Sequence, residues 1–358
     1  MPENTTSTVS DSIENVVEEE YMKSYRKYAT DFIDSNIKEE PILSEKSMRY
    51  TAYPVQYPTI WRNYKIQHKA HWVVEEIDLS KDCNDWDNVL TEEERYFLSH
   101  VLAFFAASDG LVNSNLRERF IDDVKINEAQ AAFGKQIDME NTHSEAYSLM
   151  LYTYIKDSKM VDHYINAIKT MPCIKKKADW CKKWIESDKT FAHRVVAFAV
   201  VEGVFFSGSF ASIFWLKPKP GAILNGAVLY NKLISRDEGL HMELAFELKK
   251  LLKNVLREEV VQKIVIEALE IEKEFIIESL PCRLLGINST LMIQYIEYVA
   301  DRVLVEFGYN KLYNSENPFE FMKQIDIENK ENFFEGRVSQ YANSYVDNST
   351  EFANDLDF

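Results

Sequence analysis

Two copies of a short motif, a glutamate followed three residues later by a histidine, constrain the fold of this chain most strongly. The first copy runs from Glu140 to His143 and the second from Glu238 to His241. Because residues three apart on an α-helix lie on the same face, each copy presents a carboxylate and an imidazole to one point in space. Two such helices facing each other can bind two metal ions. One copy alone is weak evidence, since such a pair also arises by chance in a glutamate-rich chain.

The hydrophobic periodicity predicts that both motifs lie on long helices, over residues 127–155 and 227–252. Thr91 and Glu94 form a capping box that begins a third long helix, which includes Asp109. Further helices are expected at 159–170, 175–186, 257–279 and 289–308, the last with an Asn288 cap. No convincing alternating strand pattern is found. The sequence therefore predicts an all-α fold with no internal domain boundary.

A nearly continuous apolar run over residues 195–216 is long enough to cross a membrane. Its centre contains Glu202, and a carboxylate at that depth in lipid is costly. No second run of this kind occurs. We therefore expect a fully buried helix in a thick bundle, which ends at the Lys-Pro-Lys-Pro-Gly sequence over residues 217–221.

The four predicted long helices each contribute acidic residues, and two of them also contribute histidine. A known arrangement for binding two metals takes one carboxylate from each of two helices and a Glu-x-x-His from each of the other two. Asp109 and Glu202 carry most of this inference, because a lone carboxylate in an apolar segment is unfavourable unless it is paired or bound to metal. Mixed oxygen and imidazole ligands suit iron or manganese. A dinuclear carboxylate site is therefore expected.

An aromatic residue follows the first motif on the same helix face. Tyr147 lies four residues after His143, which places its phenol close to the expected metals. Phe206, Phe210 and Ile234 would line that region with apolar groups. Ordinary core packing explains these three residues equally well. Together with Tyr147 they indicate protection of a reactive species.

The composition limits the partners and the compartment. The net charge of −17, from 58 acidic and 41 basic residues, argues against nucleic acid or an anionic membrane as a main partner. Four cysteines, at positions 83, 173, 181 and 282, show no zinc-site or disulfide-framework spacing, so a reducing intracellular compartment is expected. The N-terminus lacks the pattern of a signal peptide. Residues 1–38 are expected to form a disordered acidic tail, in which a short helix near residues 21–32 is the one candidate element.

Six segments carry the most specific patterns: Ala70-His71-Trp72, residues 104–110, residues 139–145, Val201-Glu202-Gly203, residues 207–212 and residues 235–241. As a series, they resemble the small subunit of class I ribonucleotide reductase in its eukaryotic or viral form. The resemblance extends from about residue 39 to the C-terminus. It implies a homodimeric, ferritin-like helical domain over residues 39–325, followed by a flexible tail over residues 326–358.

The resemblance also implies a di-iron centre in each subunit, with manganese as the alternative metal, at which O2 is activated. The implied ligands are Asp109, Glu140, His143, Glu202, Glu238 and His241. In the family, the tyrosine at the Tyr147 position becomes a stable tyrosyl radical, and Phe206, Phe210 and Ile234 correspond to its apolar pocket.

The family passes this radical to a separate large subunit, which reduces ribonucleoside diphosphates to deoxyribonucleotides. Trp72 and Asp237 match the internal relay, with Asp237 expected to hydrogen-bond both the indole and His143. In the tail, Tyr341 matches the relay tyrosine best, and Tyr345 stays open as the alternative. The ending 354–358, Asn-Asp-Leu-Asp-Phe, resembles the peptide that docks the large subunit. The implied enzyme is cytoplasmic and active only with that subunit.

Two other functions fit part of the pattern. A related di-iron oxygenase or oxidase would share the metal ligands but would not need Trp72, Asp237 or a docking tail. An iron-binding or storage bundle would tolerate loss of Tyr147 and would be expected to assemble into a shell.

Overall fold

The computed structural model describes residues 19–221, 223–280, 284 and 286–322. Within these ranges the chain is predominantly helical, and its strand-like pairing is limited to two isolated bridges, Phe32 with Leu256 and Leu284 with Ile287. The predicted all-α fold is confirmed. Residues 323–358, which contain Tyr341, Tyr345 and the expected docking peptide 354–358, lie outside the described residues.

The α-helices are α2 Pro58–Lys69, α3 Asp82–Asn88, α4 Glu92–Asn115, α5 Ile121–Asp123, α6 Asn127–Tyr154, α7 Ser158–Ile165, α8 Ala167–Thr170, α9 Pro172–Ile185, α10 Phe191–Val200, α11 Phe206–Phe214, α12 Asn225–Leu251, α13 Glu258–Ser279 and α14 Ser289–Glu306. Two π-helical segments, η5 Leu116–Phe120 and η6 Val201–Phe205, interrupt this series. Short 3-10 turns occur at η1 Ala29–Asp31, η2 Pro41–Leu43, η3 Glu45–Ser47 and η4 Val74–Glu76.

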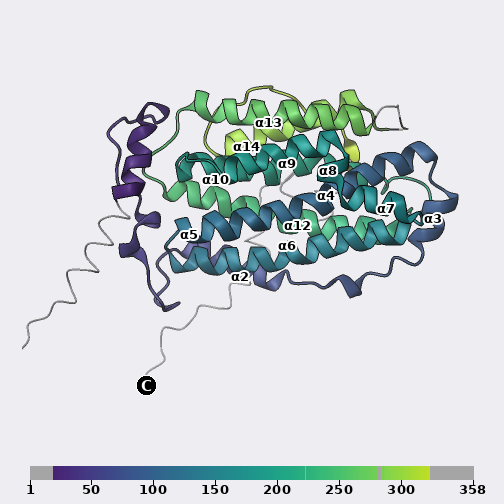
Figure 1. Ribbon diagram of the computed structural model, residues 1–358, viewed down its shortest axis with the longest axis horizontal. Helices are drawn as coiled ribbons and strands as arrows, with labels where there is room; N and C mark the ends of the chain where they lie inside the picture. The colour runs from purple at the N-terminus through teal and green to yellow at the C-terminus, as the bar shows by residue number, and fades with distance from the viewer. Residues whose placement is uncertain (1–18, 222, 281–283, 285, 323–358) are drawn as a thin grey trace, which may run out of the picture.

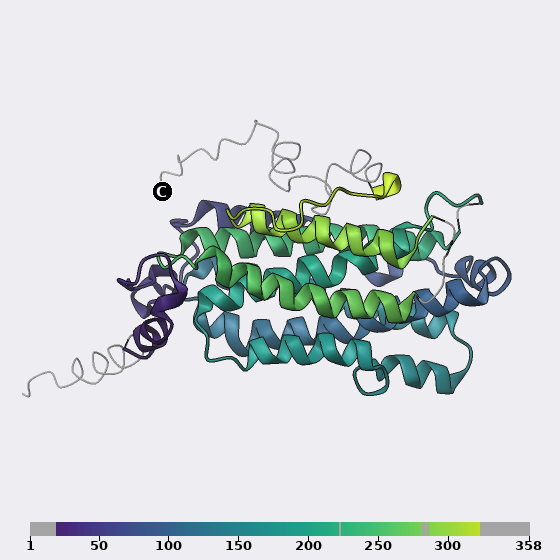
Figure 2. The same cartoon turned by 90° about the horizontal axis from the view of Figure 1, so that it is seen from above.

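The long helices run side by side along the long axis of the molecule (Figure 1). Helix α4 packs against α6, α10 against α12, and α13 against α14. Seen from above, α13 and α14 cover one side of the bundle (Figure 2). This arrangement brings the middles of four helical segments together in the core.

The apolar run is a core element, as expected. It forms one continuous helical stretch, Phe191–Phe214, which is long and apolar enough to cross a membrane, and its most apolar part is completely buried inside the protein. The sequence did not predict that its centre, around Glu202, is π-helical. Such wider turns are rare and occur frequently at functional sites.

The predicted helix caps are present. The Thr91 side chain accepts a hydrogen bond from the Glu94 amide at 3.2 Å, and the Glu94 side chain accepts one from the Thr91 amide at 3.0 Å. The Asn288 side chain accepts from the Leu291 amide at 3.0 Å. These bonds satisfy amide groups that the first turn of a helix leaves without intrahelical partners.

The N-terminal region agrees with the sequence expectation in its candidate short helix but differs from it in its packing. Residues 19–27 are helical, and the side chains of Tyr25 and Phe32 are buried. Asp31 accepts hydrogen bonds from Lys189 and His193, both at 3.1 Å, which fastens this segment across one end of the bundle (Figure 1). A disordered tail up to residue 38 is therefore wrong for residues 19–38, because their regularly spaced aromatic side chains pack against the bundle. Residues 1–18 lie outside the described ranges.

Candidate metal centre

Four helical segments bring the six predicted ligands together in the core. Asp109 comes from α4, Glu140 and His143 from α6, Glu202 from η6, and Glu238 and His241 from α12. None of these residues is more than 1% exposed. Because each helix presents its ligand side chains inward at the same level, residues up to 132 positions apart in the sequence share one pocket.

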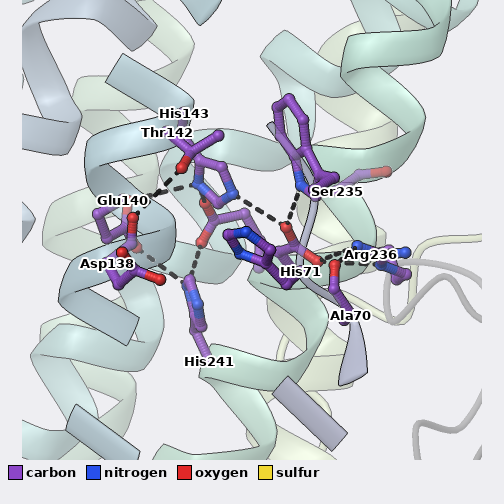
Figure 3. A network of polar contacts seen from close by, with 12 residues as sticks. Ala70, His71, Asp138, Glu140, Thr142, His143, Ser235, Arg236 and His241 are labelled. Carbon is purple, nitrogen blue, oxygen red and sulfur yellow. Dashed lines mark hydrogen bonds and ion pairs between the residues drawn. The ribbon is translucent and has the colours of Figure 1, made fainter. Parts of the chain in front are cut away.

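The donor atoms are close enough to share metal ions. Glu140, Glu202, Glu238 and His241 each offer one ligand atom within 4.8 Å of the others. His241 Nδ1 lies 3.0 Å from both Glu140 Oε1 and Glu238 Oε2 (Figure 3). His143 Nδ1 lies 2.9 Å from Glu238 Oε1. Both imidazoles therefore turn the same ring nitrogen, Nδ1, toward the carboxylates.

Four carboxylate oxygens in this pocket have no hydrogen-bond partner among the described residues, and imidazole nitrogens lie near two of them, Glu140 Oε1 and Oε2. Asp109 Oδ2 and Glu202 Oε2 are buried and have no hydrogen-bond partner among the residues that the structure describes. Buried polar atoms normally have partners, and an unpaired buried carboxylate is strongly unfavourable. Free oxygen ligands beside two imidazoles and two further carboxylates fit a pair of hard or borderline divalent cations. The residues present therefore suit the dinuclear centre that the sequence predicts.

The pKa shifts in the pocket also indicate that bound cations would stabilise its ionised carboxylates. Burial and neighbouring carboxylates raise the pKa of Asp109 and of Glu202 well above the usual range. Burial acts in the same direction on Glu238, but the imidazoles of His241 and His143 outweigh it and hold its pKa well below the usual value. In turn, although burial opposes it, the charge of Glu238 raises the pKa of His241 to about 9. The pocket holds more carboxylates than it can keep ionised without cations.

Tyr147 lies on α6 beside this pocket. Its side chain is fully buried, and its hydroxyl has no hydrogen-bond partner among the described residues. Its ring stacks on that of Phe105, with centroids 4.4 Å apart and an interplanar angle of 5°. Burial raises the pKa of Tyr147 well above its usual value, and the charge of Asp109 adds to this effect. The phenol therefore stays protonated unless it is oxidised.

The predicted apolar pocket is buried but contains one ring that sequence reasoning missed. Phe206, Phe210 and Ile234 are at most 1% exposed. Phe105 lies between Tyr147 and two of them, with ring centroids 5.6 Å from Phe206 and 4.8 Å from Phe210. Its position one turn before Asp109 on α4 was the only sequence signal for it.

The expected link between the metal pocket and Trp72 is present. The indole of Trp72 donates to Asp237 Oδ2 at 2.8 Å, and His143 Nε2 lies 3.2 Å from the same oxygen. The rings of Trp72 and His143 stack with centroids 6.2 Å apart. Asp237 therefore connects a candidate ligand to the indole through hydrogen bonds.

Two polar residues near the pocket were not predicted. Arg236 donates to Asp237 Oδ1 through Nε at 2.9 Å and Nη2 at 2.8 Å, and to the Ala70 carbonyl at 2.6 Å (Figure 3). Gln136, one turn before Glu140 on α6, donates to Glu202 Oε1 at 3.2 Å. These bonds leave Asp237 Oδ2 for the indole and imidazole, and Glu202 Oε2 for a metal.

Comparison with known proteins gives consistent results. The family model for the small chain of ribonucleotide reductase matches residues 49–318. A ribonucleoside-diphosphate reductase small chain of Acanthamoeba polyphaga mimivirus is 57% identical over 94% of this chain and 81% of its own length. Subunit M2 of the reductase from Danio rerio is 54% identical over 90% of this chain and 84% of its own length.

Solved structures show the same fold. A ribonucleotide reductase homodimer from Saccharomyces cerevisiae has a TM-score of 0.74 and 35% identity, over 89% of this chain and 99% of that chain. Dimanganese(II)-NrdF from Streptococcus sanguinis has a TM-score of 0.67 and 19% identity, over 77% of this chain and 98% of that chain. The second likeness supports the fold alone.

Proposed function

Because the chain belongs to the family of ribonucleotide reductase small chains, we propose that its buried carboxylate cluster binds two metal ions and that Tyr147 stores a radical for nucleotide reduction. The chain is a small subunit of ribonucleoside-diphosphate reductase with a ferritin-like helical fold. The metals, their number and the radical are the proposed part.

The observation that carries this proposal is the convergence of four carboxylates and two imidazoles from four helical segments in one buried pocket. Asp109, Glu140, His143, Glu202, Glu238 and His241 would hold the metals. We propose two iron ions per subunit, with manganese as the alternative, since both take oxygen and nitrogen ligands. When bound, these metals supply the redox chemistry that activates O2.

Residues beside the metals would generate and protect the radical. Tyr147 would lose one electron, with O2 as the oxidant, and one proton to the neighbouring carboxylates, which leaves a neutral tyrosyl radical. Its hydroxyl has no hydrogen-bond partner among the described residues that would keep the proton in place. Phe105, Phe206 and Phe210 exclude water and offer no readily oxidised group. A radical in such surroundings persists because reductants cannot reach it.

The relay would run from the metal pocket to the partner subunit. The hydrogen bonds of His143 and Trp72 to Asp237 give a continuous path out of the pocket. From Trp72 we propose that Tyr341, or Tyr345 as the alternative, continues the path and that residues 354–358 dock the large subunit. There the radical would initiate reduction of ribonucleotides to deoxyribonucleotides. An oxygenase or a storage protein has no use for this path.

We further propose that the chain works as a homodimer in the cytoplasm. The yeast relative of 35% identity is described as a homodimer. The absence of zinc or disulfide spacing among the four cysteines is consistent with a reducing compartment.

Metal content and activity test the proposal. Metal-free protein titrated anaerobically with ferrous iron should bind two ions per chain and, after exposure to O2, support deoxyribonucleotide formation when the large subunit is added. Glu202→Ala should lower the metal content, because it removes a carboxylate with an unpaired buried oxygen. Asp138→Asn is a matched control, since its side chain is 58% exposed on the same helix as Glu140 and pairs with Lys135. Fewer than two ions in the wild-type chain would contradict the proposal.

A further inference from the structure

A fully buried ion pair lies outside the metal pocket and has no part in the proposed chemistry. Lys177 on α9 and Glu272 on α13 are 2.6 Å apart, and their side chains are 1% and 0% exposed. Removing two charges from water is costly, so a buried ion pair is weak evidence for stability alone. The contacts of Lys177 indicate that the pair also positions a neighbouring helical segment.

The lysine also binds the main chain of a neighbouring helical segment. Its Nζ donates to the Phe205 carbonyl at 2.9 Å. The same ammonium lies over the rings of Phe104 and Phe275, at 3.3 Å and 4.1 Å from their centroids. Glu272 and the ring faces therefore hold Lys177 in the one place from which it reaches the Phe205 carbonyl.

Phe205 is the last residue of η6, the π-helical segment that contains Glu202. Two consecutive carbonyls at the end of this segment accept side-chain hydrogen bonds, Val204 from Ser207 Oγ at 3.1 Å and Phe205 from Lys177 Nζ at 2.9 Å. Because π-helical turns are rare and short, outside contacts of this kind help to hold one in place. The turn determines where Glu202 points.

Close packing fixes the same segment on two sides. A Cβ added at Gly208, at the start of α11, would lie 3.0 Å from Glu272 Oε1. A Cβ added at Gly203, next to Glu202, would lie 2.7 Å from the terminal methyl of Met242 on α12. The two glycines therefore allow α12 and α13 to approach this segment closely.

We infer that Lys177 and Glu272 are positioning residues that hold the π-helical turn so that Glu202 directs its free oxygen into the carboxylate cluster. This inference rests on the proposed metal centre. Loss of the pair would let the turn relax toward a regular helix, which would rotate Glu202 relative to the other ligands. The metal that depends on Glu202 would then bind more weakly than its neighbour.

A double variant separates the effect of the ion pair on the π-helical turn from its effect on the stability of the fold. Replacing both partners with apolar residues of similar size, Lys177→Met with Glu272→Leu, removes the donor to the Phe205 carbonyl without leaving a buried charge unpaired. Such replacements are often neutral or stabilising. A matched control, Arg194→Met with Asp123→Leu, removes another buried ion pair, between α10 and α5.

The test is an anaerobic titration of each metal-free protein with Co(II), followed by its visible absorption spectrum, together with thermal unfolding. We expect two sites in the wild type. In the Lys177→Met/Glu272→Leu variant, one site should bind roughly 10–100-fold more weakly and show altered bands, while the unfolding temperature stays close to that of the wild type. The Arg194/Asp123 control should keep the wild-type spectrum.

The outcomes are distinct. If the Lys177→Met/Glu272→Leu variant keeps the wild-type affinity and spectrum at both sites, the inference is overturned. The ion pair would then contribute only to core packing. If that variant does not fold, Gly208→Ala tests the same contact, since its Cβ would press on Glu272. It should weaken one site selectively, and unchanged binding would overturn the inference. A wild-type chain that binds fewer than two Co(II) ions would instead contradict the proposed centre itself.

Discussion

At the scale of single residues, Asp237 shows how one buried carboxylate joins three groups. It accepts from the Trp72 indole and lies within hydrogen-bond distance of His143 Nε2 through one oxygen, and it accepts from Arg236 through the other. A partner on the second nitrogen of a ligating histidine orients the ring and tunes its basicity. The residue next to Asp237, Glu238, belongs to the metal pocket itself. The proposed metal-ligand orientation and the proposed relay therefore meet in one dipeptide, Asp237-Glu238.

Asp237→Ala should damage both roles. It leaves the buried Trp72 indole without its acceptor, which costs about 1–3 kcal/mol of stability, whereas the partly exposed Arg236 guanidinium keeps the Ala70 carbonyl. Metal affinity should fall about 10-fold or more, because His143 loses its orienting partner. Urea unfolding of the metal-free protein and a Co(II) titration measure the two effects.

Asp138→Ala is the control for this change, because its exposed carboxylate bonds only to Lys135 at the surface among the contacts described. Its effect on stability should stay within about 0.5 kcal/mol. Equal stability and equal metal affinity in the two variants would show that Asp237 orients nothing.

The sequence predicts those residues of the site whose signal is local. Each Glu-x-x-His is visible as a spacing, and Glu202 is visible as an acid inside an apolar run. Arg236 and Gln136 carry no such signal, because an arginine or a glutamine on a helix is ordinarily solvated. Their importance comes from contacts with segments far away in the sequence, such as the 66 positions between Gln136 and Glu202. Only the packing of the helices reveals them.

At the scale of helices and segments, the N-terminal region depends on one histidine at the start of α10. His193 Nε2 lies 3.1 Å from Asp31 Oδ2, and its Nδ1 lies 2.8 Å from the Thr190 hydroxyl. Burial and the charge of Lys189 lower the pKa of His193 to about 4, and Arg194 acts in the same direction, against the opposing charge of Asp31. The neutral imidazole is therefore the form that the folded protein holds.

The pH dependence follows from this shift. Above pH 6.5 the imidazole is neutral in the folded and unfolded states, so it does not affect the free energy of unfolding. As the pH falls from 6.5 toward about 4, the unfolded state takes up the proton first and stability is lost. At pH 5.5 the loss through this group should be about 1 kcal/mol.

His193→Asn isolates that contribution, since it keeps a polar side chain that cannot take up a proton in this range. Urea unfolding at pH 7.5 and pH 5.5 should show the wild type losing more stability than the variant by this amount. An equal loss in both proteins would mean that His193 is not the group responsible.

The helices illustrate what periodicity can and cannot predict. The start of α4 and the start of α14 were predicted from their caps, because Thr91 and Asn288 satisfy amides next to them in sequence. The π-helical turn at Glu202 was not predicted. In a run where nearly every residue is apolar, a five-residue change of helical period leaves no pattern to detect. The packing of residues 19–38 was missed for a different reason, since the acidic composition of the segment was given more weight than the helical spacing of its aromatic side chains.

At the scale of the whole molecule, the proposed function requires the chain to deliver a radical from a closed core to another subunit. The described core excludes solvent from Tyr147, so contact with the partner must take place elsewhere. The proposed docking residues 354–358 are far along the chain from the metal pocket. Making the radical and using it are therefore separable properties.

Deletion of residues 354–358 should separate them. The shortened protein should bind two metals and form the radical as the wild type does, because no residue of the pocket is removed. Deoxyribonucleotide formation with the large subunit should be lost, since the docking peptide is absent. An activity assay beside the resonance spectrum measures both. Full activity in the shortened chain would rule out the docking role.

The most direct test of the central claim is the electron paramagnetic resonance spectrum of metal-free protein reconstituted with ferrous iron and O2, compared with Tyr147→Phe treated in the same way. The Tyr147→Phe control is conservative, since the tyrosine hydroxyl has no hydrogen-bond partner among the described residues and the ring stacking on Phe105 is kept. The account predicts a sharp tyrosyl doublet in the wild type and none in the variant, with equal iron content in both. The same doublet in Tyr147→Phe, or no doublet in the wild type with either iron or manganese, would contradict it.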